Sequence, residues 1–124
     1  MAPGEIVFSV LSQAPAVQAL VGVRIYPLRI PQGKPRPAIT YQLITRVPQG
    51  SPLCVLSDVA RVQLSIFTDT YAQGEALATA CRQALHGYAL GEVYAELSNE
   101  IDQYDEGAVC YFKSQDYELE LPAA

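Results

Sequence analysis

The hydrophobic pattern is clearest in residues 59–87. The first part alternates, with Val62, Leu64 and Ile66 on one side and mainly polar residues between them, which is typical of a half-buried strand. The second part places apolar residues at helical spacing, and Gly87 is a helix stop signal. The segment therefore predicts a strand followed by a helix, whose apolar face consists of Leu77, Ala80, Cys81, Ala84 and Leu85.

The start of this helix carries a capping signal. Thr70 fits the N-cap position and Gln73 fits the N3 position of a capping box, in which each side chain binds a backbone N–H group of the other residue. We therefore expect the helix to begin directly after Thr70.

The N-terminal part of the chain has a second helical pattern. Residues 5–20 place Ile6 and Leu11 on one apolar face, and Pro15 opens a second short helical segment. Gly22 then ends the helical part. We expect a bent or broken helical region before the first strand.

Residues 23–37 predict a short strand and a loop. Residues 23–27 are a brief apolar strand or edge, whereas residues 28–37 are rich in proline and include Lys34 and Arg36. Proline cannot donate to a strand ladder, so we expect an exposed basic loop. The loop lacks the glycine pattern of a phosphate-binding loop, which argues against a nucleotide site.

Residues 38–47 predict a second long strand, rich in β-branched and aromatic residues. Residues 48–58 contain proline, glycine and serine, and we expect them to form a loop that turns the chain back into the strand at Val59. The two strands would form an antiparallel pair. Apolar side chains at the tip of this loop, Leu53 and Val55, fit a contact with a partner, and a simply disordered loop explains them equally well.

The last third of the chain predicts two further strands. Alternation runs from Glu92 to Ile101 and again from Val109 to Leu121, and residues 105–107 predict a hairpin turn with Gly107 in the left-handed position. The order helix, two strands, helix, two strands predicts an α+β fold. We expect a two-layer sandwich, with a mainly antiparallel sheet and helices packed on one face, in a single domain of residues 1–124.

Composition narrows the class of protein. No apolar run approaches the roughly 20 residues that cross a bilayer, and the N-terminus lacks the basic lead of a signal peptide. We therefore expect a soluble protein that is not exported and has no membrane contact. The three cysteines are widely spaced and have one histidine as a possible nitrogen partner, which does not fit a zinc site.

The formal net charge of −5 is unevenly divided along the chain. Residues 1–91 carry seven Lys/Arg and four Asp/Glu, a balance of +3, whereas residues 92–124 carry nine Asp/Glu and Lys113 alone, a balance of −8. Opposite charge on two parts of one surface favours contact between copies. A solvated acidic hairpin that keeps the protein soluble explains the same pattern.

Candidate chemistry is sparse. Cys81 lies on the apolar helix face and Cys110 in a strand-like run, so we expect buried structural thiols. Cys81 and His86 lie about 140° apart around the predicted helix, a poor geometry for a nucleophile and its base. We expect His86, in the last turn, to interact with free helix carbonyls.

The acidic residues do not form a convincing site either. Residues 102–106 resemble a calcium loop superficially, but Tyr104 stands where an oxygen ligand belongs. Glu96 and Glu100 could serve acid–base chemistry in a cleft, although they fit a solvated strand face equally well. We expect no metal, no cofactor and no catalytic residue.

Four stretches that together cover most of the chain carry a resemblance to a known family. They are ALVGVRIYP (19–27), PQGKPRPAITYQ (31–42), RVQLSIFTDTYAQGEALATACRQAL (61–85), and the closing DQYDEG with SQDYELEL. By order and length they resemble the small tail-completion or tail-terminator proteins of long-tailed bacteriophages and phage-like particles, a family long catalogued as a domain of unknown function. The resemblance implies a structural protein rather than an enzyme.

The family resemblance also implies partners and a location. Such a protein would form a homo-oligomeric ring, expected to be a hexamer, on the last row of tail-tube subunits, stop tube growth and join the tail to head-completion proteins. DNA would pass through the lumen without specific binding, and the protein, made in the host cytoplasm, would reside in the virion at the tail end or neck. The expected interface residues are Lys34, Arg36, Leu53, Val55, Glu100, Asp102, Asp105 and Glu106.

The sequence leaves open both the location of the acidic hairpin and an alternative class of function. The acidic hairpin, residues 100–106, could line the lumen of such a ring and repel DNA phosphate, or it could face outside solvent. The alternative from another class is a small cytosolic α+β hydrolase or ligand-binding protein that uses Cys81 and His86 or the carboxylates of the acidic hairpin.

Overall fold

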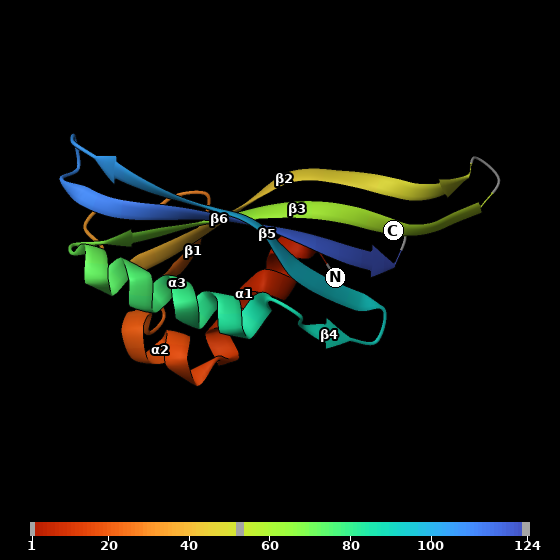
Figure 1. Cartoon of the computed structure of the whole chain (residues 1–124), viewed down its shortest axis with the longest axis horizontal. Helices are drawn as coiled ribbons and strands as arrows, with labels where there is room; N and C mark the ends of the chain where they lie inside the picture. The colour runs from red at the N-terminus through yellow and green to blue at the C-terminus, as the bar shows by residue number, and fades with distance from the viewer. Residues whose placement is uncertain (1, 52–53, 123–124) are drawn as a thin grey trace.

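The structure, a computed structural model, describes residues 2–51 and 54–122. It has a mixed α/β fold in which three helices lie on one side of a six-stranded sheet (Figure 1). This arrangement agrees with the predicted α+β class. The elements are α1 (Pro3–Gln13), α2 (Pro15–Val21), β1 (Ile25–Pro27), β2 (Ala38–Ser51), β3 (Cys54–Thr68), α3 (Tyr71–Leu85), β4 (Ala89–Leu90), β5 (Val93–Asp105) and β6 (Cys110–Pro122).

The predicted break in the N-terminal helical region is confirmed. α1 ends before Ala14, Pro15 takes the first position of α2, and Gly22 caps α2 with a φ of 60°. Among the described residues, no single helix has the length and apolar character to cross a membrane. α1 and α2 together pass that test by length and composition, but the pair is bent by 85°.

The sheet has the strand order β1-β2-β3-β6-β5-β4. β1 pairs parallel with β2, and every other neighbouring pair is antiparallel. The two predicted antiparallel pairs, β2 with β3 and β5 with β6, are confirmed. They join through β3 and β6 at the centre of the sheet.

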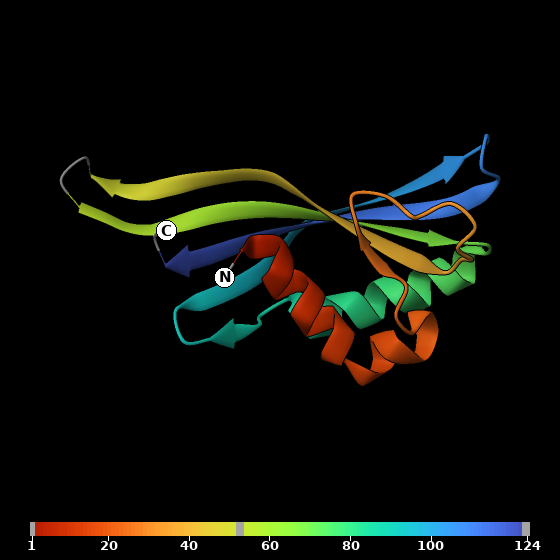
Figure 2. The same ribbon diagram turned by 180° about the vertical axis from the view of Figure 1, so that it is seen from behind.

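The hydrophobic core lies between the helices and the sheet. Alternate residues of β3 face the helices and are buried, as the period-two pattern predicts. β6 contributes Tyr117, Leu119 and Leu121 to the same layer, and α3 covers them with Leu77 and Leu85. The helices cover the middle of the sheet, whereas both long hairpins extend past them at opposite ends (Figures 1 and 2).

The predicted loop over residues 48–58 was wrong. β2 runs on to Ser51 and β3 begins at Cys54, with Gly50 opposite Val55. Pro48 does not end β2 because, beyond Tyr41, no described strand pairs with the outer edge of β2. The segment is therefore an extended two-stranded arm. The expected tip residue Leu53 lies outside the described residues.

The predicted turn between β5 and β6 is confirmed, but one detail was wrong. Val109, with a φ of 53°, takes a left-handed conformation that was expected at Gly107. Asp105 Oδ1 accepts a hydrogen bond from Ala108 N (3.1 Å) within this turn. The short strand β4 was not predicted, since two residues are too few to show an alternation.

Candidate functional site: a charged and aromatic pocket below the acidic hairpin

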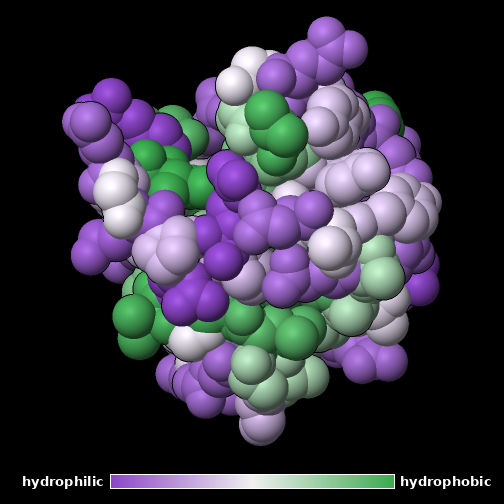
Figure 3. Space-filling view, turned by 90° about the vertical axis from the view of Figure 1, so that its left-hand side faces the viewer, coloured by the Kyte–Doolittle hydropathy of each residue, from purple (hydrophilic) through white to green (hydrophobic). Residues whose placement is uncertain are grey.

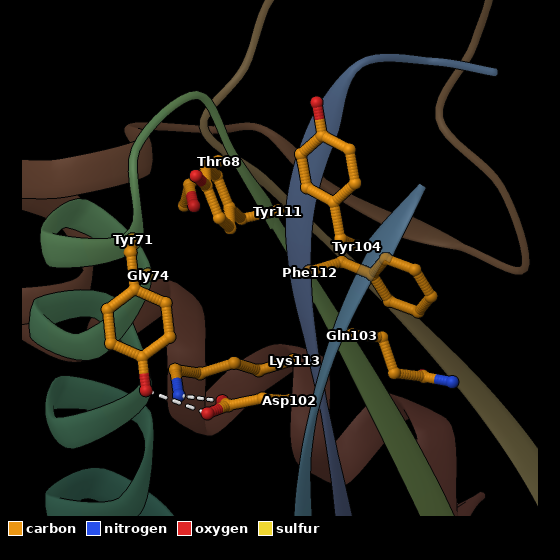
Figure 4. Close-up of a pocket in the computed structure, with 9 residues that line it drawn as sticks. All are labelled: Thr68, Tyr71, Gly74, Asp102, Gln103, Tyr104, Tyr111, Phe112 and Lys113. Atoms are coloured by element: carbon orange, nitrogen blue, oxygen red, sulfur yellow. Dashed lines mark hydrogen bonds and ion pairs between the residues drawn. The ribbon is translucent and has the colours of Figure 1, made fainter. Parts of the chain in front are cut away.

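A pocket lies where the acidic hairpin passes the first turn of α3 (Figure 4). It has a volume of about 260 Å³ and is lined by residues from the end of β3, the start of α3 and both strands of the β5–β6 hairpin. Seen from this end, the surface shows separate apolar patches among polar residues (Figure 3). The pocket is lined by Thr68, Tyr71, Gly74, Asp102, Gln103, Tyr104, Tyr111, Phe112 and Lys113.

Lys113 is the central charge of the pocket. Its side chain is 5% exposed, and its Nζ makes ion pairs with Asp102 Oδ1 and Glu75 Oε1. Tyr71 donates a hydrogen bond to Asp102 Oδ2 (2.7 Å), and its ring centroid lies 5.0 Å from Lys113 Nζ. The cluster therefore ties β5, β6 and α3 together, and Figure 4 shows the contacts of Tyr71 and Lys113 with Asp102.

Hydrogen bonds set the protonation of this cluster. Burial alone lowers the pKa of Lys113, but the hydrogen bonds to Asp102 and Glu75 outweigh it and raise this pKa above its ordinary value. Hydrogen bonds from Lys113, and then from Tyr71, lower the pKa of both carboxyls. The same two carboxylates raise the pKa of Tyr71 to about 12. At neutral pH the cluster thus holds two carboxylates, one ammonium and a neutral phenol.

Four aromatic side chains, Tyr71, Tyr104, Tyr111 and Phe112, form much of the pocket wall. Tyr104 and Tyr111 lie edge to face with ring centroids 5.0 Å apart, and Tyr71 meets Tyr111 at 6.1 Å. Phe67 stacks on Phe112 at 5.5 Å. Such pairs hold ring positions with a modest gain beyond area burial. They keep the protruding hairpin aligned with the body of the sheet.

The first turn of α3 fits closely against this site. The predicted N-cap is confirmed, since Thr70 Oγ1 accepts from Gln73 N (3.1 Å). The second half of the predicted capping box differs, because Gln73 Oε1 accepts from Asp69 N (3.3 Å) and not from Thr70. Gly74 is buried, and a Cβ atom there would lie 3.1 Å from Thr68 Oγ1. The helix can therefore approach β3 closely at this position.

Acid pH is expected to weaken the attachment of the hairpin to α3. The pKa values of Asp102 and Glu75 are lowered on folding, so their contribution to the free energy of unfolding is complete above about pH 5. It is lost as the pH falls through the folded-state pKa values, while Lys113 stays charged. Thermal unfolding followed by circular dichroism from about pH 7 to about pH 2 should show this decline.

Two variants test whether this cluster, and not the protonation of other carboxylates, causes the loss of stability at acid pH. Lys113→Met keeps a long buried side chain but removes the ammonium, so its stability should fall less steeply below about pH 5. Arg61→Gln is the control, because Arg61 Nη2 lies 3.7 Å from Glu118 Oε1 in an exposed pair of small expected value. An unchanged acid decline in Lys113→Met would show that the cluster does not control the pH dependence.

Three other predicted interface residues, Lys34, Arg36 and Val55, do not line the pocket. Lys34 is exposed in the proline-rich loop, and Arg36 Nε donates to Asp69 Oδ1 (2.8 Å), which raises the pKa of Arg36. The backbone of Val55 pairs with Gly50 in the arm of β2 and β3. The structure therefore does not bring all the predicted residues into one site.

Three predicted carboxylates flank the cluster along the acidic hairpin. Glu100 Oε1 accepts from Gln115 Nε2 (2.6 Å), and the same amide nitrogen donates to Ala78 O (3.0 Å) in α3. Asp105 binds within the turn, and Glu106 is exposed beside it. Thus Glu100 and Asp102 anchor the hairpin, whereas Asp105 and Glu106 lie at its tip.

Cys81 and His86 are not arranged as a nucleophile and its base. Cys81 is fully buried, and burial raises its pKa to about 12, so the thiol stays protonated. Cys110 is also buried, as predicted. His86 was expected to bind helix carbonyls, but its Nδ1 accepts from Leu97 N (2.9 Å), because β5 crosses the end of α3 there. Within residues 2–51 and 54–122, no group of three or more His, Cys, Asp or Glu could hold a metal.

Comparison with known proteins identifies the family. The sequence profile described as "Tail completion protein gp17" matches residues 5–111, which is most of the chain. The chain belongs to this tail-completion family. It is therefore a structural protein of the virion that takes part in tail completion and virion assembly.

The fold of this tail-completion protein also occurs in a solved structure. A chain from a structure titled "Virion of native gene transfer agent (GTA) particle" superposes with a TM-score of 0.73 at 20% sequence identity. The match covers 94% of this chain and 92% of that chain. No curated protein sequence matches the chain.

The residues that organise the pocket of this tail-completion protein were missed by sequence reasoning. Lys113, Tyr71 and Glu75 were not candidates, although Lys113 is the single basic residue among nine acids in the last third. A second signal was present. Lys113 shares the period-two positions of Tyr117 and Leu119, so the pattern places a charge on the core face of β6.

Proposed function

We propose that copies of this chain close into a ring on the end of a tail tube, stop tube growth, and join the tail to head-completion proteins of the neck. The observation that carries this proposal is membership of the tail-completion family over residues 5–111. A fold shared with a chain of a gene transfer agent virion supports it. The chain would be made in the host cytoplasm and act as part of the virion.

The proposed unit is a single two-layer domain of residues 1–124. One hydrophobic cluster runs from α1 to β6, which supports this view. Helices that cover one face of the sheet leave the other face, and both long hairpins, free to meet partners. The basic loop around Lys34 is a candidate contact for the tail-tube or neck protein.

We propose six copies in the ring. Head-to-tail contacts between unlike surfaces generate a closed ring when the rotation between copies closes. The opposite balances of residues 1–91 and 92–124 suit such a contact, because each copy offers both charges. Native mass spectrometry of the assembled protein counts the copies, and a number other than six would correct this part of the proposal.

The lumen of this ring is proposed to be acidic. Asp105 and Glu106 at the tip of the acidic hairpin would repel DNA phosphate and let the genome slide without specific binding. Carboxylates on the sheet face opposite the helices support an acidic passage, since Glu118 and Glu96 pair across β6 and β5 there. A map of the assembled particle with these groups on the outer rim would contradict this proposal.

The test of the proposed function is the length of tail tubes. Adding the protein to polymerising tail-tube protein should limit tube length, and electron microscopy should show a ring at the tube end. Tubes of unchanged length, without end rings, would refute the proposal. Length distributions with and without the protein are the measurement.

A matched control variant separates assembly from catalysis. His86→Ala and Cys81→Ala remove the groups on which the hydrolase alternative depends, and both variants should still cap tubes. Since Cys81 is fully buried and His86 binds Leu97 N, neither side chain is positioned as a nucleophile and base. Loss of capping in a folded His86→Ala variant would contradict a purely structural role.

A further inference from the structure

The sheet leaves two long strand edges open, one on each side. β1 covers β2 at residues 39–41, and β4 covers β5 at residues 93–94. In the described part of the chain, no strand pairs with the outer edge of the rest of β2 or β5. Open edges of this length template pairing with another chain.

The hydrogen-bond pattern shows which backbone groups face the open edge of β5. Ala95 uses its N–H and C=O toward residues 87–88, and Leu97 N donates outward to His86. Carrying this alternation through the irregularity between Leu97 and Asn99, with the register of β5 on β6, leaves the backbone groups of Glu100, Asp102 and Tyr104 facing outward.

The same reasoning applies to β2. Ile39 N and Tyr41 O bind the chain on the β1 side, so their backbone groups face outward. Past the irregularity between Leu43 and Thr45, the outward positions are Arg46 and Pro48. Pro48 is thus placed where its missing N–H costs no bond within the copy.

The two open edges are offset along the strands in a complementary way. Following the register partners across the sheet, Asp102 pairs with Lys113, Lys113 with Ile66, and Ile66 with Ile39, so Asp102 and Ile39 of one copy lie at the same height along the strands. The open part of β2, however, begins only after Tyr41. β5 runs antiparallel to β2. When the open part of one edge lies antiparallel to the open part of the other, β1 and β4 fall beyond the two ends of the paired stretch.

The offset between the two open edges is compatible with a sheet that closes into a barrel. Bringing Arg46 of a second copy beside Asp102 shifts that copy by about six residues, or about 20 Å along the strands. The step across β2, β3, β6 and β5 is about 19 Å. Together these give a strand tilt of about 45°, at the upper end of the roughly 35–45° of closed barrels.

Charge favours the same pairing. Arg46 Nε donates to Asp58 Oδ2 (2.6 Å), and the described part of the chain supplies no acceptor for its two terminal nitrogens. Asp58 and Ala60 lie on the helix side of the sheet, and so do Glu100 and Asp102, which contact β6 and α3 residues there. An antiparallel partner strand therefore places the guanidinium beside acidic side chains.

We propose that the open edge of β5, residues 99–105, pairs antiparallel with the open edge of β2, residues 42–48, of a second copy. This inference rests on the proposed ring and names its contact. Repetition of the contact from copy to copy continues one sheet around the ring. The irregularity between Leu97 and Asn99 bounds this stretch on β5, and Pro48 with the irregularity between Gln49 and Gly50 bounds it on β2.

Hydrogen exchange tests the pairing without any substitution. In the assembled ring, the amides of Asp102 and Tyr104 should exchange much more slowly than in the monomer. Gln103 N faces β6 in both states and is the internal control, with slow exchange throughout. Rings in which Asp102 and Tyr104 exchange as fast as in the monomer would overturn the edge pairing.

Disulfide crosslinking gives an independent test. In a Cys54→Ser background, Thr45→Cys is combined with Ile101→Cys or Gln103→Cys, which are all exposed positions on the sheet face away from the helices. Adjacent strands meet disulfide geometry, so oxidation of assembled protein should yield covalent multimers up to the full ring. The control combines Thr45→Cys with Gln83→Cys, a substitution at an exposed position of α3. This control should stay monomeric in a denaturing gel.

The outcomes separate this inference from the proposed function. Covalent multimers from either edge pair, absent from the control, support the edge contact. Rings seen by electron microscopy without such multimers would overturn the edge contact and leave the ring intact. Wild-type protein that forms no ring with tail-tube protein would overturn both.

Discussion

Leu64→Ala is expected to lower the free energy of unfolding by about 2–5 kcal/mol. Leu64 is fully buried at the centre of β3, opposite Gln115 of β6 and Tyr41 of β2. Replacing it with alanine removes the transfer free energy of the lost atoms and leaves a cavity that surrounding strands cannot close. Urea or thermal unfolding followed by circular dichroism measures the change.

Ser65→Ala is the matched control for this variant. Ser65 is the next residue of the same strand and lies on the face away from the helices. Ser65 is half-buried there, and the loss of its hydroxyl should change stability by no more than about 1 kcal/mol, the net contribution of a typical hydrogen bond. Equal stability of Leu64→Ala and wild type would show that the buried face of β3 was misassigned.

Gln115→Leu is expected to lower the free energy of unfolding by about 2–4 kcal/mol. Gln115 is fully buried in β6, and its Oε1 accepts from Tyr117 OH (2.8 Å) while Nε2 donates to Ala78 O and Glu100. Leucine fills the space but leaves the Tyr117 hydroxyl buried without a partner. Burial raises the pKa of Tyr117 far above its ordinary value, so its hydroxyl stays protonated and still needs a hydrogen-bond partner.

A double variant tests this explanation. Tyr117→Phe removes the hydroxyl that Gln115→Leu leaves unsatisfied, so the double variant should regain part of the lost stability. The interaction free energy from the cycle of four proteins, measured by urea unfolding, should be about 1–2 kcal/mol. Strict additivity of the two losses would show that the pair is not coupled.

The elements of the protein were largely predictable from local pattern. The alternation of Val62, Leu64 and Ile66 predicted β3, and the cap at Thr70 predicted the start of α3, because both signals act within a few residues. The loop prediction for residues 48–58 was wrong, because it relied on proline and glycine, which usually mark a loop. Pairing with β3, on an edge that needs no further hydrogen bonds, made a strand of them instead.

The candidate site was less predictable than the fold. Asp102 was a candidate for its charge, but its partners Lys113 and Tyr71 come from β6 and α3 and meet it through the register of three elements. His86 gained its partner, the N–H of Leu97, in the same way. Sequence spacing contains no information on such contacts, since they depend on how separate elements pack together.

The sequence by itself determined the α+β class, the buried faces of the strands, the uneven charge, and a family resemblance confirmed over residues 5–111. These properties depend on short-range periodicity and composition, which each segment carries independently. The tertiary structure alone decided which charges are neutralised, as at Lys113, and which strand edges stay open, as on β2 and β5. Both depend on long-range pairing, whose register is set by the whole core.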